Sequence, residues 1–117
     1  MHYQAAPREE AKLVMCVRGA VYDVALDLRR DSPTHQKWVA VELSSVNYRM
    51  LYIPEGCAHG YQTLTPDVLL QYWISEPYSA EHSRGVRWND PAFRIDWPAC
   101  SERLLSERDA NYPDYVP

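Results

Sequence analysis

The sequence predicts an all-β protein of the barrel or sandwich class. Three observations support this fold class: strand-like segments recur at short intervals, turn residues separate them, and no segment has a convincing helical period. The alternation is clearest over residues 20–28, where apolar side chains occupy every second position and Asp23 and Asp27 lie on the opposite face. Such a pattern is typical of a half-buried strand. A length of 117 residues suits a single domain, 1–117, with its own core.

The predicted strands follow one another through the first two thirds of the chain. They cover residues 12–18, 20–28, 37–43, 48–53, 58–64 and 68–74, and a short strand is expected near 86–88. Tyr3 and Gln4 have the character of a strand end, so the sequence opens abruptly inside a strand and we expect an uncovered barrel edge there. After Tyr78, prolines interrupt an irregular C-terminal extension, in which a helical turn is expected within 101–108.

Composition and charge argue against several functions. A net charge of −4 with scattered basic residues speaks against a nucleic-acid surface. No apolar run is long enough to cross a membrane and the first residues are polar, so neither a membrane span nor a signal peptide is predicted. The cysteines form no CxxC pair, and no two histidines lie within about 20 residues, which speaks against a bound metal. Reduced thiols favour the cytoplasm.

Several polar side chains are candidates for chemistry, and each also has a purely structural interpretation. Tyr72 lies in an apolar strand as a core tyrosine would, and Lys12 opens a strand, where lysine is usually exposed. Asp109 fits a surface carboxylate, and His59 is as consistent with a structural as with a functional role. A His–Asp pair, a tyrosine and a lysine that converge in a barrel mouth would nevertheless suit proton abstraction beside a carbonyl group.

A set of short motifs, in order along the chain, resembles the dTDP-4-dehydrorhamnose 3,5-epimerases, a cupin (jelly-roll) family that epimerises a nucleotide-linked keto sugar. The matching stretches are residues 2–4, 12–14, 19–27, 32–34, 38–39, 51–56, 58–60, 87–91, 95–98 and 105–109. The resemblance implies a cupin-type β-barrel, a dTDP-linked 4-keto sugar as substrate, no metal or other cofactor, and a homodimer. It also implies a place in dTDP-rhamnose and O-antigen (lipopolysaccharide) biosynthesis.

The resemblance further implies roles for individual residues. His2 matches the family's catalytic base and Asp109 its carboxylate partner. Tyr72 matches the tyrosine acid on the opposite side of the sugar ring, and Lys12 matches a lysine beside the keto oxygen. Substrate-binding roles are implied for Gln4, His59, Tyr78 and Arg108.

The sequence departs from the family pattern in three places. Family members carry a segment before the His-aromatic-Gln motif that supplies strands and much of the dimer contact, whereas here that motif begins at His2. Pro77 replaces a common aromatic residue, and Trp73 replaces a common lysine. Two other functions therefore stay open: a weakly active or non-catalytic barrel that binds a sugar nucleotide, and a related sugar-nucleotide ketoisomerase.

Overall fold

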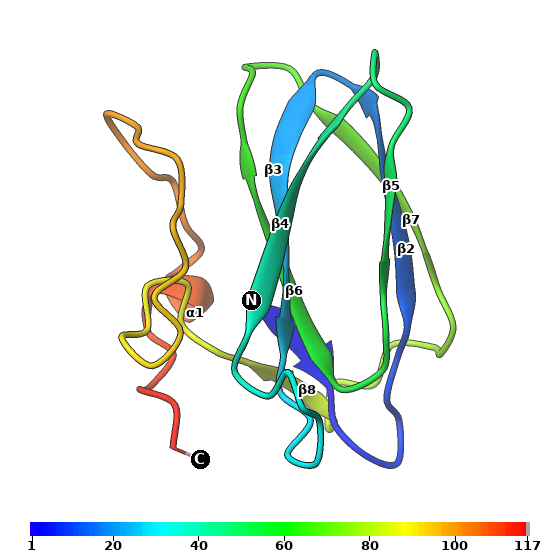
Figure 1. Cartoon of the computed structure of the whole chain (residues 1–117), viewed down its shortest axis with the longest axis vertical. Coiled ribbons are helices and arrows are strands. Elements are labelled where there is room, and N and C mark those ends of the chain that lie inside the picture. Colours follow the sequence, from blue (N-terminus) through cyan, green and yellow to red (C-terminus); the bar gives the residue numbers. More distant parts are fainter. Residues whose placement is uncertain (117) are drawn as a thin grey trace.

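The computed structural model describes residues 1–116 and contains two antiparallel sheets that face each other (Figure 1). The elements are β1 (His2–Gln4), β2 (Lys12–Arg18), β3 (Ala20–Asp27), β4 (Trp38–Ser44), β5 (Met50–Ile53), β6 (Cys57–Thr63), β7 (Leu69–Ile74), β8 (Ser83–Gly85) and α1 (Glu107–Ala110). One sheet has five strands in the order β4-β3-β6-β1-β8, and the other has three in the order β5-β2-β7. The predicted all-β barrel architecture is confirmed.

Two of the predicted elements lie elsewhere along the chain. The short strand expected near 86–88 lies earlier in the chain, as β8, which pairs with β1 and ends at Gly85. The helical turn expected within 101–108 begins later, as α1. Its start is set by Ser106, the N-cap residue, whose side chain accepts a hydrogen bond from the backbone N–H of Asp109.

The expectation of an uncovered edge at the first strand is wrong. β1 is an inner strand of the five-stranded sheet, paired with β6 on one side and with β8 on the other. His2 lies opposite His59 of β6 and Gly85 of β8, and the side chain of Met1 is buried. The return of the chain as β8 therefore covers the edge and anchors the strand that carries His2.

The expectation that β3 is half-buried is also wrong, because both of its faces are covered. Val24 and Leu26 are fully buried on the outer face, against the C-terminal segment 86–115. Asp23 and Asp27 are buried as well. Buried carboxylates need polar partners, and here a histidine and the residues of the following turn supply them.

Two apolar clusters hold the molecule together. The space between the sheets is filled by Val14, Cys16, Val21, Ala25, Leu43, Ile53 and Cys57. On the outer side of the five-stranded sheet, the C-terminal segment adds a second cluster of Met1, Val24, Leu26, Ala58, Val86 and Phe93. In Figure 1 this segment lies beside β3, β4 and β6, away from β2, β5 and β7. Among the described residues, no helix is long and apolar enough to cross a membrane.

Candidate active site

The first candidate group is the pair formed by His2 and Asp109. Nε2 of His2 donates to Oδ1 of Asp109 over 2.5 Å, although the two residues are far apart in the sequence. Ser106, the N-cap of α1, donates its hydroxyl to the other oxygen of the carboxylate, Oδ2, over 2.7 Å. Strand β1 thus positions the imidazole, and the capped turn of α1 positions the carboxylate. The pairing that the resemblance implies for these two residues is present in the structure.

The pair favours a neutral imidazole beside a charged carboxylate. Burial lowers the pKa of His2 below its ordinary value of 6.5, and the hydrogen bond to Asp109 opposes this shift only in part. Burial alone would raise the pKa of Asp109, but the hydrogen bonds from Ser106 and His2 outweigh it and the pKa is lowered. Because Nε2 carries the proton shared with Asp109, Nδ1 of His2 keeps a free lone pair. That atom can accept a proton.

Lys12 lies directly behind this pair and is buried, contrary to the exposed position that a strand-opening lysine usually has. Its Nζ contacts Oε1 of Glu10 at 2.9 Å and donates to the backbone oxygen of His2 over 3.4 Å. The side chain of Glu10 is equally buried, so the lysine charge is balanced locally. The structure therefore brings three of the four predicted catalytic residues together: His2, Asp109 and Lys12.

A second His–Asp pair lies next to the first, inside the barrel. Nε2 of His59 bonds to Oδ1 of Asp23, which is fully buried, while Oδ2 of Asp23 has no hydrogen-bond partner. The register of β6 brings this pair to the site, because His59 is the cross-strand neighbour of His2. The sequence pattern did not identify Asp23 as a partner. The signal was present only as a charged residue within an otherwise apolar strand.

Tyr72 approaches the site from the opposite sheet. It pairs with Val14, which is fully buried in the core between the sheets, so its side chain leaves β7 on the inner face. Burial raises the pKa of Tyr61, and Tyr72 and Asp23 raise it further, so Tyr72 and the carboxylate of the second pair each lie near Tyr61. The side chain is 51% exposed. The core interpretation of Tyr72 is therefore wrong: its side chain leaves the inner face of β7 but stays half-exposed.

Two further predicted residues, Gln4 of β1 and Tyr78 of the loop before β8, are linked through that loop. Gln4 is buried and holds the loop before β8, because its Oε1 accepts from the backbone N–H of Ser79 over 2.6 Å and its Nε2 donates to Pro77 and Arg8 carbonyls. The same loop carries the exposed Tyr78.

Arg108 precedes Asp109 on α1 and donates to Oγ of Ser83 over 2.9 Å. Tyr112, and to a smaller extent Tyr78, raise the pKa of Arg108. A permanent positive charge and two tyrosine side chains therefore lie near one another beside the His2–Asp109 pair.

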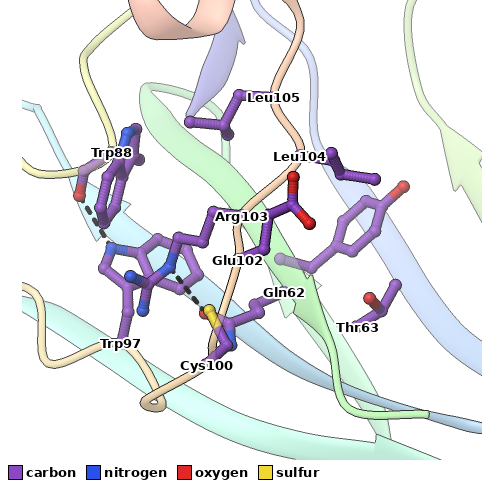
Figure 2. Close-up of a pocket in the computed structure, with 10 residues that line it drawn as sticks. Gln62, Thr63, Trp88, Trp97, Cys100, Glu102, Arg103, Leu104 and Leu105 are labelled. Atoms are coloured by element: carbon purple, nitrogen blue, oxygen red, sulfur yellow. Dashed lines mark hydrogen bonds between the residues drawn. The ribbon is translucent and has the colours of Figure 1, made fainter. Parts of the chain in front are cut away.

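A separate hollow of about 420 Å³ lies on the outer side, between β6 and the C-terminal segment (Figure 2). Its wall is held by internal contacts: the Arg103 guanidinium lies 4.7 Å from the Trp88 ring centre, and Trp97 donates to the Trp88 carbonyl over 2.8 Å. None of the eight predicted site residues lines it. Tyr61 lines it and also contacts the His59 ring, so the hollow adjoins the site without sharing its chemistry.

Within residues 1–116, no group of three or more histidine, cysteine, aspartate or glutamate side chains is arranged to hold a metal ion. Cys16, Cys57 and Cys100 are all free thiols.

The fold defines a jelly-roll barrel of the cupin type, shared with solved sugar-nucleotide epimerases. The dTDP-4-dehydrorhamnose 3,5-epimerase of Bacillus anthracis str. Ames, with TDP and PPi bound, matches with a TM-score of 0.93 and 44% identity over 97% of this chain and 65% of that chain. A 3′-monoepimerase from Streptomyces bikiniensis, in complex with dTDP-quinovose, matches with a TM-score of 0.90 and 37% identity over 97% of this chain and 57% of that one.

Sequence comparison leads to the same group of proteins. The family model described as dTDP-4-dehydrorhamnose 3,5-epimerase matches residues 1–116, and the chain belongs to this family. The dTDP-4-dehydrorhamnose 3,5-epimerase of Sinorhizobium fredii (strain NBRC 101917 / NGR234) is 49% identical over 113 residues, which is 97% of this chain and 58% of the relative. The chain thus spans about three fifths of the length of such relatives. The family resemblance seen in the sequence is confirmed.

Proposed function

We propose that this chain forms the catalytic barrel of a dTDP-4-dehydrorhamnose 3,5-epimerase. The reaction would be a metal-independent acid–base epimerisation at C3 and C5 of a dTDP-4-keto-6-deoxyhexose. The observation that supports this most directly is the pair of His2 and Asp109 at the barrel mouth, with the buried Lys12 behind it. The C4 ketone acidifies the hydrogens at C3 and C5, so a base of near-neutral pKa is sufficient to remove them.

His2 acts as the base. Its Nε2–H is held by Asp109, so Nδ1 takes the proton from the sugar carbon. The electron pair of the broken C–H bond moves onto the keto oxygen and forms an enolate. Asp109 orients the ring and stabilises the imidazolium that results, as carboxylates do in other His–Asp pairs. The lowered pKa of His2 keeps the base unprotonated at neutral pH.

Tyr72 acts as the acid. It belongs to β7, in the sheet opposite the one that carries His2, so the two side chains reach the sugar from opposite sides. When the tyrosine hydroxyl delivers a proton to the opposite face of the carbon, the enolate collapses to the ketone and the centre is inverted. Solvent restores the proton of Tyr72 and takes the one held by His2. Lys12 supplies positive charge toward the developing enolate oxygen.

The remaining predicted residues would bind the nucleotide sugar. Arg108 offers a cation at the entrance for the diphosphate, beside the exposed ring of Tyr78. His59, held by Asp23, lines the interior beside the base, and Gln4 supports the loop that carries Tyr78. Relatives solved with TDP and with dTDP-quinovose support a dTDP-linked substrate.

We propose a homodimer in the cytoplasm as the working form. The outer face of the three-stranded sheet is apolar and open: Tyr52 is 62% exposed, Trp73 48% and Met50 45%. Such an apolar face favours association. Because most soluble oligomers are symmetric assemblies of identical chains, we expect the partner to be a second copy of this chain.

Solvent deuterium exchange tests the proposed reaction. In D₂O, the chain should introduce deuterium at C3 and C5 of dTDP-4-keto-6-deoxy-D-glucose, as followed by NMR. His2→Ala should abolish exchange at both carbons because it removes the base that is proposed to act at each of them. Tyr72→Phe should allow proton removal but suppress inversion, so deuterium returns with the original configuration.

Three other outcomes would overturn this proposal. Binding of dTDP in calorimetry without any exchange would identify a non-catalytic binding barrel. A product with a shifted keto group would identify a ketoisomerase. Exchange at C3 alone would place the chain with monoepimerases such as the Streptomyces bikiniensis protein.

A further inference from the structure

The cross-strand neighbour of His2 on β8 is a glycine, and its missing side chain leaves a niche beside the imidazole. Gly85 lies directly opposite His2 in the pairing of β1 with β8. The ring of Tyr112 fills this niche so closely that a Cβ atom on Gly85 would overlap it. The backbone of Gly85 has no positive φ angle, so the glycine is required by this close approach and not by strain.

Tyr112 contacts two members of the site at once. Its ring lies edge-on to the imidazole of His2, with 6.2 Å between the ring centres and an interplanar angle of 64°. The second contact of the Tyr112 ring is with Arg108, whose guanidinium lies 5.7 Å from the ring centre. The hydroxyl of Tyr112 is buried and has no hydrogen-bond partner. The ring therefore makes the contact with His2, whereas the hydroxyl lies close enough to Arg108 to raise the pKa of that side chain.

We propose that Tyr112 is a positioning residue for His2: its ring packs against one side of the half-exposed imidazole and sets the plane of that ring. This inference rests on the proposed function of His2 as the base. The helical turn α1 delivers Asp109 to one nitrogen of the ring, and Tyr112, two residues after that helix, packs against the side of the ring. The imidazole is thus held by a hydrogen bond in its plane and by an aromatic edge contact.

The charged groups around His2 allow the role to be measured. Asp109 faces Nε2 from α1 and Arg108 acts on the ring from the same turn. The amino group of Met1 precedes β1, Lys12 of β2 donates to the backbone oxygen of His2, and His59 of β6 is the cross-strand neighbour of His2. Burial is the largest cause of the lowered pKa of His2. The imidazole is about half-exposed, and the ring of Tyr112 covers part of the remaining half, so its removal should admit more water and raise the pKa of His2 toward 6.5.

The experiment follows the titration of His2 by NMR in the full chain, together with the pH profile of solvent deuterium exchange. Tyr112→Leu should raise the pKa of His2, move the acid limb of the profile to higher pH by the same amount, and lower the exchange rate about tenfold at neutral pH. Tyr112→Phe should leave both readouts near those of the unaltered chain because it keeps the ring. Gly85→Ala should reproduce the leucine variant because its methyl group displaces the ring.

Tyr115→Leu is the matched control. Tyr115 belongs to the same C-terminal segment but packs against Phe93, with 5.0 Å between ring centres. The control should lose stability without any change in the titration of His2. An unchanged pKa of His2 in Tyr112→Leu, or in Gly85→Ala if the leucine variant does not fold, would overturn the proposal. Since the titration needs no turnover, a chain without exchange would refute the proposed function and leave this test intact.

Discussion

The two sheets of this barrel differ in how many of their faces other parts of the chain cover. The five-stranded sheet is covered on both faces, by the core between the sheets and by the C-terminal segment 86–115. The three-stranded sheet faces the core on its inner side, and the C-terminal segment lies away from it (Figure 1). On its outer face Tyr52 and Trp73 are exposed. The residues proposed for proton removal belong to the covered half, whereas Tyr72, the proposed acid, belongs to the open one.

This difference separates the proposed site residues whose positions are fixed by packing within the chain from those that are less well supported. The C-terminal segment that covers the five-stranded sheet also carries Asp109, so the same contacts that stabilise this half position His2, the proposed base. The sheet that carries Tyr72 has an exposed outer face, and Tyr72 itself is half-exposed. We therefore expect changes on the covered half to affect stability, and changes on the open half to affect association.

The largest effect should come from removing a tryptophan from the covered half. Trp97→Ala should lower the free energy of unfolding by about 3 to 5 kcal/mol, because Trp97 packs on the outer cluster and its indole N–H is bonded to Trp88. Trp73→Ala, on the open face, is the control and should cost no more than about 1 kcal/mol. Denaturant unfolding followed by circular dichroism measures both. Equal losses would show that the open face is as well packed as the covered one.

The buried pair of Asp23 and His59 should give the next largest effect. Asp23→Asn should destabilise the chain by about 3 kcal/mol, because it removes the charge from a fully buried hydrogen-bonded pair. Asp67→Asn provides the comparison, since its ion pair with Arg18 is exposed and should contribute less than about 1 kcal/mol. If both variants unfold at the same denaturant concentration, Asp23 does not support the covered half.

Charges on the open face should change association and little else. The double variant Tyr52→Lys with Trp73→Lys should sediment as a monomer at concentrations where the unaltered chain forms dimers, because two cations would face each other across a symmetric interface. Its unfolding free energy at low concentration should stay close to the original value. Sedimentation velocity checks the prediction, and an unaltered chain that is monomeric throughout would contradict it.

The smallest effect is a pH dependence of stability that follows from His2. Its folded pKa lies below the ordinary value of 6.5, so the unfolded chain binds more protons as the pH falls below that value. The contribution of His2 is therefore present above pH 6.5 and decreases as the pH falls toward its folded pKa. His2→Asn should flatten this part of the stability curve, measured by unfolding at a series of pH values. A curve with the same slope in both proteins would rule out the contribution.

Local patterns were sufficient to predict the strands and the class of fold, because alternation and turn residues depend on neighbouring positions. The motifs were sufficient to identify the family and to single out His2 and Asp109. The partner of His59 was not predictable, since it depends on the register between β3 and β6. The covering of β1 by β8 also depends on a long-range return of the chain. Tyr112 is visible only once Gly85 is placed opposite His2.

Hydrogen exchange of the backbone amides of β1 tests the central claim most directly. If the chain itself holds the base, the amides of His2–Gln4 should be protected as a group to a degree comparable with β3 and β6, because β1 is paired on both sides. The amides of β5 and β7, at the edges of the open sheet, should exchange faster. Rapid exchange throughout β1, with β3 still protected, would show that His2 is not held in place and would contradict the account.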